Sequence, residues 1–247
     1  MWCRFFIFMI LTCLLVMSST VWADEGCSNW YHRYQPIRNQ EAKDFLKKGI
    51  SCALEFFGPP HTQFNHIFLR FSYPLQKQDR IRSGFQLLEI TDSKKGIYTI
   101  YLSRKPSDYA FWGQLAHEIA HCLNPKLHDA YAEGLNTLFA EKLLIQEGRD
   151  WDGWQTYFKK GGEPLYGSTY FLMKDIDRIV GEENIAKLMN YVEYSDESGK
   201  HMRINIFQWL DSLPPDLQKQ VSDIIKSHAP KVRSHIKKMN LAFMQPE

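Results

Sequence analysis

Apolar residues recur at every third or fourth position along much of the chain, which is the spacing of helices that bury one face. The first such segment covers residues 40–57, and Gly58-Pro59-Pro60 ends it. After residue 148 the same spacing returns, interrupted by glycine, proline and polar stretches, with little strand pattern. It predicts helices at residues 150–160, 166–180, 182–194 and 215–227.

Three segments before residue 104 have the patterns of β-strands. They cover residues 66–73, 85–91 and 96–103. The last alternates between two sets of side chains, Ile97, Thr99 and Tyr101 against Tyr98, Ile100 and Leu102. The preceding Lys94-Lys95-Gly96 is typical of a hairpin turn. We therefore predict a small, mainly antiparallel sheet.

Two more helices are predicted after these strands. The first opens at Pro106-Ser107 and closes at Asn124-Pro125, and its apolar stripe has the spacing needed to pack on the sheet. The second covers residues 128–146 and has two apolar sides, one of which surrounds Glu133. Burying a carboxylate costs several kcal/mol unless it is paired or ligates a metal, so Glu133 is expected to have a partner.

Length and composition limit the architecture and the partners. With 247 residues, 44% of them hydrophobic, the chain can bury one large core or two lobes around a cleft. We predict an α+β fold with a mixed half at residues 24–148 and a helical half at residues 149–247 that completes the cleft. The formal net charge of +2, from 30 basic and 28 acidic residues, indicates neither nucleic acid nor an anionic membrane as a partner.

Residues 1–23 have the pattern of a secretory signal peptide. Arg4 precedes an apolar run at residues 5–17, and Val21 and Ala23 supply the small residues of a cleavage site. The run is short for a membrane span, which disfavours the alternative of an uncleaved anchor. We expect cleavage after Ala23, a secreted or periplasmic protein, and no membrane contact after cleavage.

Three cysteines remain once the predicted signal peptide is removed. In an exported protein Cys27 and Cys52 are candidates for a disulfide, with two unpaired buried thiols as the alternative. Cys122 lies nearer the apolar stripe of its helix than the neighbouring histidines do. We therefore interpret it as a small buried hydrophobic residue.

The strongest chemical pattern is His117-Glu118-x-x-His121 in the helix after the strands. Residues four apart lie on the same face of a helix, so the two imidazoles can bind one Zn²⁺. A neutral imidazole leaves the ion enough positive charge to acidify a bound water, and Glu118 can take the proton. The motif therefore predicts a zinc site in which Glu118 is a base and not a ligand.

Three residues are candidates for the third ligand. Glu133 follows the motif by 12 residues, whereas His128 and Asp129 lie at the start of the second helix. Asp129 is also typical of an N-terminal cap or charge there, so we favour Glu133. A metzincin would need glycine and then histidine or aspartate where this chain has Asn124 and Leu127.

The HExxH motif followed by Glu133 in Tyr-Ala-Glu-Gly-Leu resembles the gluzincins, in particular the peptidase MA-like group. The resemblance covers residues from about 97 to 192. It implies a thermolysin-like catalytic domain with its small sheet packed on the motif helix, zinc bound by His117, His121 and Glu133, and Glu118 as the base.

We therefore expect a secreted zinc metallopeptidase that acts on peptide or protein substrates, with residues 96–103 as an edge strand that aligns an extended substrate. The resemblance also implies a tyrosine that stabilises the oxyanion. Tyr166 is the first candidate, followed by Tyr170 and His201. The alternative function is a non-catalytic, zinc-stabilised binding module, which the presence of Glu118 disfavours because a structural zinc site needs no base.

Overall fold

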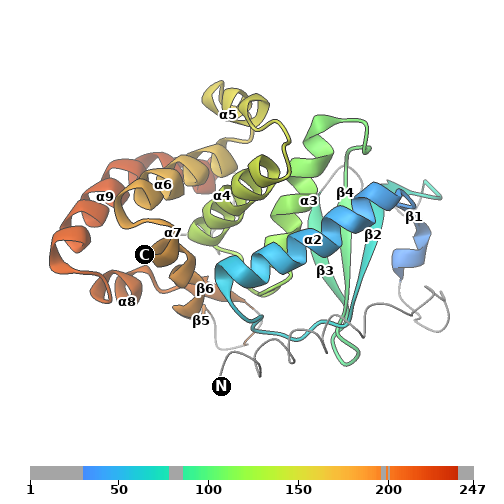
Figure 1. Ribbon diagram of the computed structural model, residues 1–247, viewed down its shortest axis with the longest axis horizontal. Coiled ribbons are helices and arrows are strands. Elements are labelled where there is room, and N and C mark those ends of the chain that lie inside the picture. Colours follow the sequence, from blue (N-terminus) through green and yellow to red (C-terminus); the bar gives the residue numbers. More distant parts are fainter. Residues whose placement is uncertain (1–29, 78–85, 196–198, 200, 239–247) are drawn as a thin grey trace, which may run out of the picture. The chain divides into compact units, whose positions relative to one another are not determined.

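A four-stranded mixed sheet and a group of helices make up the computed structural model, which describes residues 30–77, 86–195, 199 and 201–238 (Figure 1). The strand order is β1–β2–β4–β3. The strands are β1 (Tyr34–Pro36), β2 (His66–Pro74), β3 (Leu87–Asp92) and β4 (Ile97–Leu102). A short 3-10 helix, η2 (Trp30–Arg33), precedes β1. The predicted signal peptide and Cys27 lie outside the described residues.

The sheet is mainly antiparallel, as predicted, but its central pair is parallel. β4 pairs antiparallel with β3 on one side and parallel with β2 on the other. The chain runs from β2 to the outer position of β3 and then returns between them as β4. The prediction that residues 96–103 form an edge strand is therefore wrong, and β3 takes that position. Tyr98 to Leu102 are all buried, which is typical of an interior strand.

Helix α2 (Gln40–Phe57) has the predicted bounds. Asn39 caps it by accepting a hydrogen bond from the backbone N–H of Ala42 at 2.7 Å. It ends at Gly58, whose φ of 87° is unfavourable for other residues. The helix packs on the motif helix, and Gly49 allows the close approach, since a Cβ there would lie 2.7 Å from Cδ1 of Ile119.

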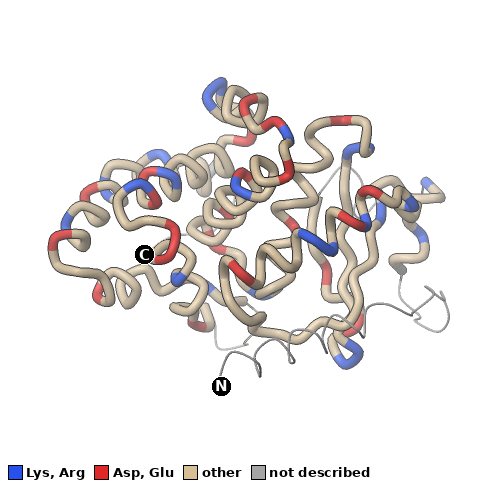
Figure 2. Tube along the Cα trace, in the orientation of Figure 1, with Lys and Arg blue, Asp and Glu red and all other residues tan. Residues whose placement is uncertain are grey.

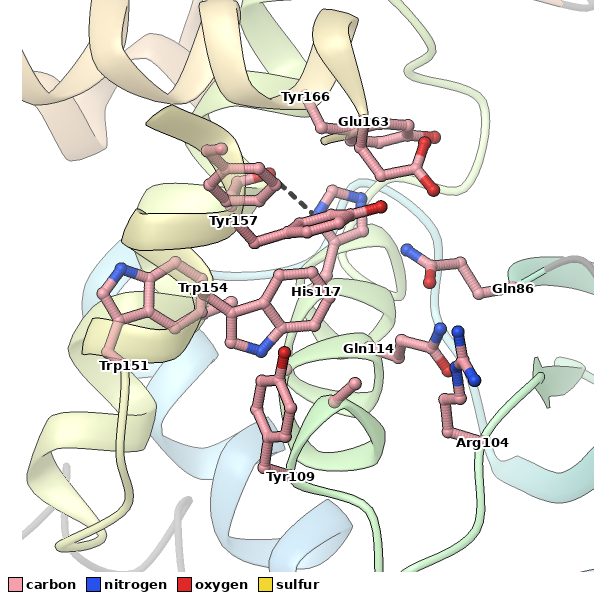
Figure 3. A pocket seen from close by; sticks show the side chains of 15 residues that line it. Gln86, Arg104, Tyr109, Gln114, His117, Trp151, Trp154, Tyr157, Glu163 and Tyr166 are labelled. Atoms are coloured by element: carbon pink, nitrogen blue, oxygen red, sulfur yellow. Dashed lines mark hydrogen bonds between the residues drawn. The ribbon is translucent and has the colours of Figure 1, made fainter. Parts of the chain in front are cut away.

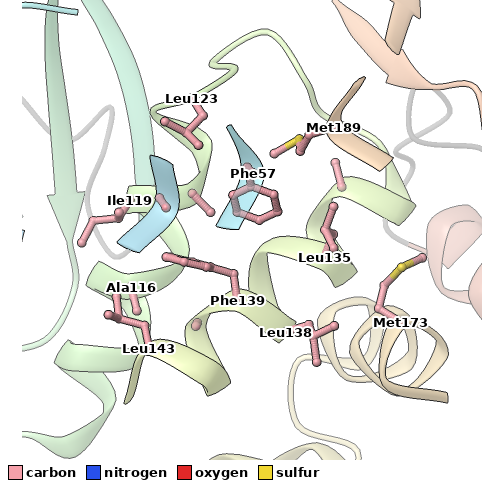
Figure 4. Packing of buried hydrophobic residues seen from close by; sticks show 14 of the residues in the cluster. Phe57, Ala116, Ile119, Leu123, Leu135, Leu138, Phe139, Leu143, Met173 and Met189 are labelled. Carbon is pink, nitrogen blue, oxygen red and sulfur yellow. The ribbon is translucent and has the colours of Figure 1, made fainter. Parts of the chain in front are cut away.

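The motif helix α3 (Tyr109–His121) and the following helix α4 (Ala130–Gln146) pack against each other in the interior. Asp108 caps α3, two residues beyond the predicted Pro106. Every residue of α3 from Phe111 onward is buried. Figure 4 shows Ile119 of α3 and Leu123, two residues after its end, in one hydrophobic cluster with Leu135 and Phe139 of α4. The metal motif thus lies on the most enclosed helix of the described chain.

The second half is helical except for one hairpin. Its elements are α5 (Asp152–Lys159), α6 (Pro164–Val180), α7 (Glu182–Ala186), η4 (Lys187–Asn190), β5 (Val192–Tyr194), β6 (Met202–Ile204), α8 (Ile206–Asp211) and α9 (Pro215–Lys238). The predicted single helix at residues 182–194 is wrong. Its last residues leave the helix because they pair with β6, Val192 opposite Ile204. The prediction for residues 215–227 was too short, because α9 continues to Lys238.

The mixed and helical halves belong to one compact unit that begins at Tyr31. α4 packs on α6, and α6 packs on α9. Gly134 permits the first contact, because a Cβ there would lie 2.4 Å from the carbonyl oxygen of Thr169. Basic and acidic residues are both present on the outer helices (Figure 2). None of the helices in the described ranges is long and apolar enough to cross a membrane.

Candidate metal centre

Three ligand atoms converge between α3 and α4. Nε2 of His117 lies 3.1 Å from Nε2 of His121 and 3.0 Å from Oε2 of Glu133. The remaining separation, from His121 Nε2 to the same Glu133 oxygen, is 3.5 Å. All three side chains are buried. In the part of the chain that the structure describes, this is the one cluster of three or more such residues suited to a metal ion.

The separations match those of a tetrahedral zinc site. Zinc binds imidazole nitrogen and carboxylate oxygen at about 2.0–2.2 Å, which places neighbouring ligand atoms about 3.3–3.6 Å apart. The observed separations of 3.0, 3.1 and 3.5 Å need to change by only a few tenths of an ångström to fit. Two histidines and one carboxylate are also a catalytic donor set, since they leave a fourth position open.

Thr137 fixes the proton position on His117. Its hydroxyl donates to the backbone carbonyl of Glu133 at 2.7 Å, so its oxygen accepts a hydrogen bond from His117 Nδ1 at 3.1 Å. Figure 3 draws the second contact as a dashed line. A neutral imidazole has one N–H, so Nε2 then points a lone pair at the Glu133 carboxylate. Two acceptors that face each other at 3.0 Å repel unless a cation lies between them.

The charge state of Glu133 suits a ligand. Burial by itself would raise the pKa of this carboxyl, but the charge of His121 and the closeness of both imidazoles hold it well below its ordinary value. The side chain is therefore ionised near neutral pH. The sequence favoured Glu133 over His128 and Asp129, and of these three only Glu133 places a ligand atom beside those of both motif histidines.

His128 and Asp129 have other contacts. His128 shares a hydrogen bond with the carbonyl of Pro125 at 2.9 Å, and burial, followed by the charge of His121, lowers its pKa to about 4. Asp129 caps α4 by accepting from the backbone N–H of Ala132 at 2.8 Å. Its second oxygen accepts from the backbone N–H of Ile204 in β6. Asp129 therefore joins α4 to the β5–β6 hairpin.

Glu118 lies beside the three ligands and is buried. Burial raises its pKa to about 7, the charge of His121 opposes this rise, and the charge of Glu133 adds to it. The backbone N–H of Leu88 in β3 donates a hydrogen bond to its carboxylate. A carboxyl that titrates near neutrality can both accept and return a proton. The edge strand and the candidate base are thus in direct contact.

Tyr166 is the oxyanion candidate that the fold brings to the ligands. It lies in the first turn of α6, and its ring centroid is 5.5 Å from that of His117. The negative charge of Glu133, followed by burial and the charge of Glu118, raises the pKa of its phenol well above the ordinary value. The hydroxyl therefore keeps its proton and can donate a hydrogen bond.

The other two oxyanion candidates are placed differently. Tyr170 is fully buried, and its hydroxyl accepts from Trp151 Nε1 at 3.0 Å and from Lys174 Nζ at 2.9 Å. It belongs to the contact between α5 and α6. His201 is exposed, and its ring lies 6.3 Å from that of His128, which in turn stacks on His121 at 5.6 Å. The sequence reasoning missed Thr137, although it lies one helical turn after Glu133 on the same face of α4.

No protein-family model matches the chain, and no curated protein or solved structure matches it. The activity of the site is therefore inferred from its donor atoms and their surroundings.

Proposed function

We propose that the protein is a zinc-dependent peptidase of the gluzincin type with a thermolysin-like catalytic domain. The observation that carries this proposal is the convergence of three buried ligand atoms beside a fourth buried group, Glu118, whose pKa is near 7. A structural zinc site has four protein ligands and does not need a base. Here the fourth side chain is a carboxyl suited to proton transfer.

The residues around the ligands have the roles that amide hydrolysis requires. Zinc, when bound, supplies Lewis-acid polarisation to the substrate carbonyl and to water. Glu118 takes a proton from the attacking water and passes it to the leaving amine. Tyr166 donates its phenolic hydrogen to the carbonyl oxygen as that oxygen gains negative charge.

Strand β3 is the surface that aligns an extended substrate. Its outer edge has no neighbouring strand in the described sheet, so a peptide can pair with it as an added strand. Leu88 brings this strand within hydrogen-bond reach of Glu118. A peptide bound at β3 would thus pass close to the base. In this proposal β3 has the role that the sequence predicted for residues 96–103, the alignment of an extended substrate.

The test combines metal analysis with a cleavage assay on a peptide library. We expect about one Zn²⁺ per chain and hydrolysis that stops when a chelator removes it. Glu118→Gln should keep the zinc but lose hydrolysis by about 10² to 10⁴, because the amide keeps the shape without the basicity. Single alanine variants of His117, His121 and Glu133 should lose zinc. Wild-type zinc content in all three would overturn the ligand assignment.

The same experiment separates the peptidase from a non-catalytic module. Stoichiometric zinc in a wild-type protein that cleaves no peptide in the library would contradict the peptidase and favour a zinc-stabilised binding protein. Full hydrolysis by Glu118→Gln would leave the metal site in place and remove Glu118 from the mechanism.

A further inference from the structure

A cavity of about 140 Å³ lies next to the metal ligands. His117 and Tyr166 both form part of its lining, so a group held there is close to the reacting atoms (Figure 3). The metal motif predicts no such cavity, because most of its aromatic lining lies in α5 or directly before it. What the cavity binds would therefore distinguish this chain's substrate from those of other zinc hydrolases.

One wall of the cavity is aromatic. Its members are Tyr109, Trp151, Trp154, Tyr157 and Phe158. Figure 3 shows the rings of Tyr109, Trp151, Trp154 and Tyr157 gathered on one side of the cavity. Trp154 is at their centre, with ring centroids 6.0 Å from Trp151, 6.0 Å from Tyr157 and 6.2 Å from Tyr109. Contacts at these distances favour a further aromatic ring as the occupant.

Gly113 of α3 allows Trp154 to take this position. A Cβ at residue 113 would lie 2.3 Å from Nε1 of Trp154, so any other residue would displace the indole. The Nε1 atom is buried and has no hydrogen-bond partner among the described residues. The aromatic wall is therefore packed directly on the helix that carries the metal motif.

The opposite wall is polar and carries charges of both signs. Gln86, Gln114, Arg104 and Glu163 line it, and Figure 3 shows Arg104 and Glu163 well apart along this side. Arg104 is already paired with Asp108 at 3.9 Å, and both Arg104 and Glu163 are exposed, so neither offers a charged occupant a buried partner. The charges therefore favour a neutral group over the cations that aromatic cages often bind.

We infer that this cavity binds a neutral aromatic side chain of the substrate, from a residue next to the scissile bond. The inference rests on the proposed peptidase function, because that function makes the contents of the cavity part of a peptide. Phe, Tyr and Trp have the uncharged rings that the wall fits. Small side chains lack an aromatic ring, and acidic and basic side chains are charged.

The first test is the cleavage profile of the zinc-loaded protein on a peptide library. We expect Phe, Tyr or Trp to be enriched at one of the two positions flanking the cleaved bond. A matched pair of peptides with Phe or Ala at that position should differ by at least about tenfold in kcat/KM. Cleavage with small or charged residues at both flanking positions would overturn the inference and leave the peptidase function intact.

Variants test the aromatic wall directly. Trp154→Ala should reduce the Phe/Ala ratio of kcat/KM by about tenfold, with loss mainly on the Phe peptide. Tyr157→Ala provides a second variant, because the Tyr157 side chain is 41% exposed and its truncation spares the core. Phe207→Ala, at an exposed aromatic of α8 outside the cavity, is the matched control and should keep the wild-type ratio. An unchanged ratio in Tyr157→Ala and in folded Trp154→Ala would exclude this cavity.

A binding measurement separates the cavity from catalysis. The Glu118→Gln protein should bind N-acetyl-phenylalanine amide at least about tenfold more tightly than N-acetyl-alanine amide. Selective binding that Tyr157→Ala weakens, in a protein that cleaves no peptide, would support aromatic recognition while contradicting the peptidase function. Equal affinity for the two amides would overturn the aromatic assignment whether or not the wild-type protein is a peptidase.

Discussion

In the proposed peptidase, Thr137 and Tyr166 act through single hydroxyl groups, and each group has a different task at the candidate metal centre. The Thr137 hydroxyl is fixed by its bonds to Glu133 and His117 and sets which nitrogen of His117 is free to bind metal. The Tyr166 hydroxyl keeps its proton because two carboxylates lie nearby. Loss of the Thr137 hydroxyl should therefore lower metal affinity, and loss of the Tyr166 hydroxyl should lower turnover.

Thr137→Val removes the hydroxyl and keeps the shape of the side chain. Because His117 then loses the partner of Nδ1, we expect zinc affinity to fall by about 10- to 100-fold, as measured by competition with a chelator. Thr137→Ser keeps the hydroxyl and should remain close to the wild type. Equal affinity in the Val and wild-type proteins would show that Thr137 does not orient the ligand.

Tyr166→Phe removes only the hydroxyl that the proposed mechanism assigns to the developing oxyanion. We expect kcat to fall by about 10² to 10³ while zinc content and KM stay nearly unchanged. Steady-state kinetics on one peptide, with metal analysis of the same sample, measure all three. Normal turnover in this variant, together with a loss in His201→Ala, would move the donor to the β5–β6 hairpin.

At the scale of elements, the β5–β6 hairpin is joined at the start of α4 to the helices that carry the candidate metal ligands. The backbone N–H of Met202 donates to the carbonyl of Lys126 at 2.8 Å, and Asp129 accepts from Ile204. Burial raises the pKa of Asp129 to about 6 from an ordinary value of 3.8, although the backbone N–H groups of Ala132 and Ile204 act against the rise. The junction is thus sensitive to pH.

The raised pKa of Asp129 predicts how stability depends on pH. The folded protein holds this proton more tightly than the unfolded chain, so the stabilisation is complete below about pH 4 and is lost as the pH rises through about 6. Asp129→Asn should remove this dependence. Urea unfolding of both proteins with chelator present, at pH 4 and pH 7, measures it. A difference between the two proteins that is the same at both pH values would contradict the prediction.

At the scale of the whole molecule, export and a disulfide concern residues outside the described ranges. We propose that the chain is exported after cleavage behind Ala23, and that Cys27 then pairs with Cys52, which is half-buried on α2. Such a bridge would tie the start of the mature chain to the helix that covers α3.

The disulfide predicts a simple labelling pattern. Thiol labelling of the exported protein under denaturing, non-reducing conditions should modify Cys122 alone, because the other two thiols are oxidised. Mass spectrometry of the same sample should find Asp24 as the first residue. Labelling of all three cysteines would exclude the bridge, and an N-terminus at Met1 would exclude cleavage.

Local spacing predicted most of the helices and the candidate metal ligands of this protein. The periodicity of residues 40–57 predicted α2 to the residue, and the HExxH spacing placed His117 and His121 on one face, because both depend on neighbours a few positions apart. The small apolar surroundings of Glu133 likewise predicted its burial beside a partner. An α+β fold also followed from the local patterns.

Contacts between distant residues decided the rest. The interior position of β4 depends on which strands pair with it, and residues 182–194 form β5 at their end because β6 lies beside them. The hydrogen bond from His117 to Thr137 and the aromatic wall of the cavity arise only when separate helices pack together. Pairing and packing of this kind leave no regular spacing in the sequence, so only the tertiary structure specified them.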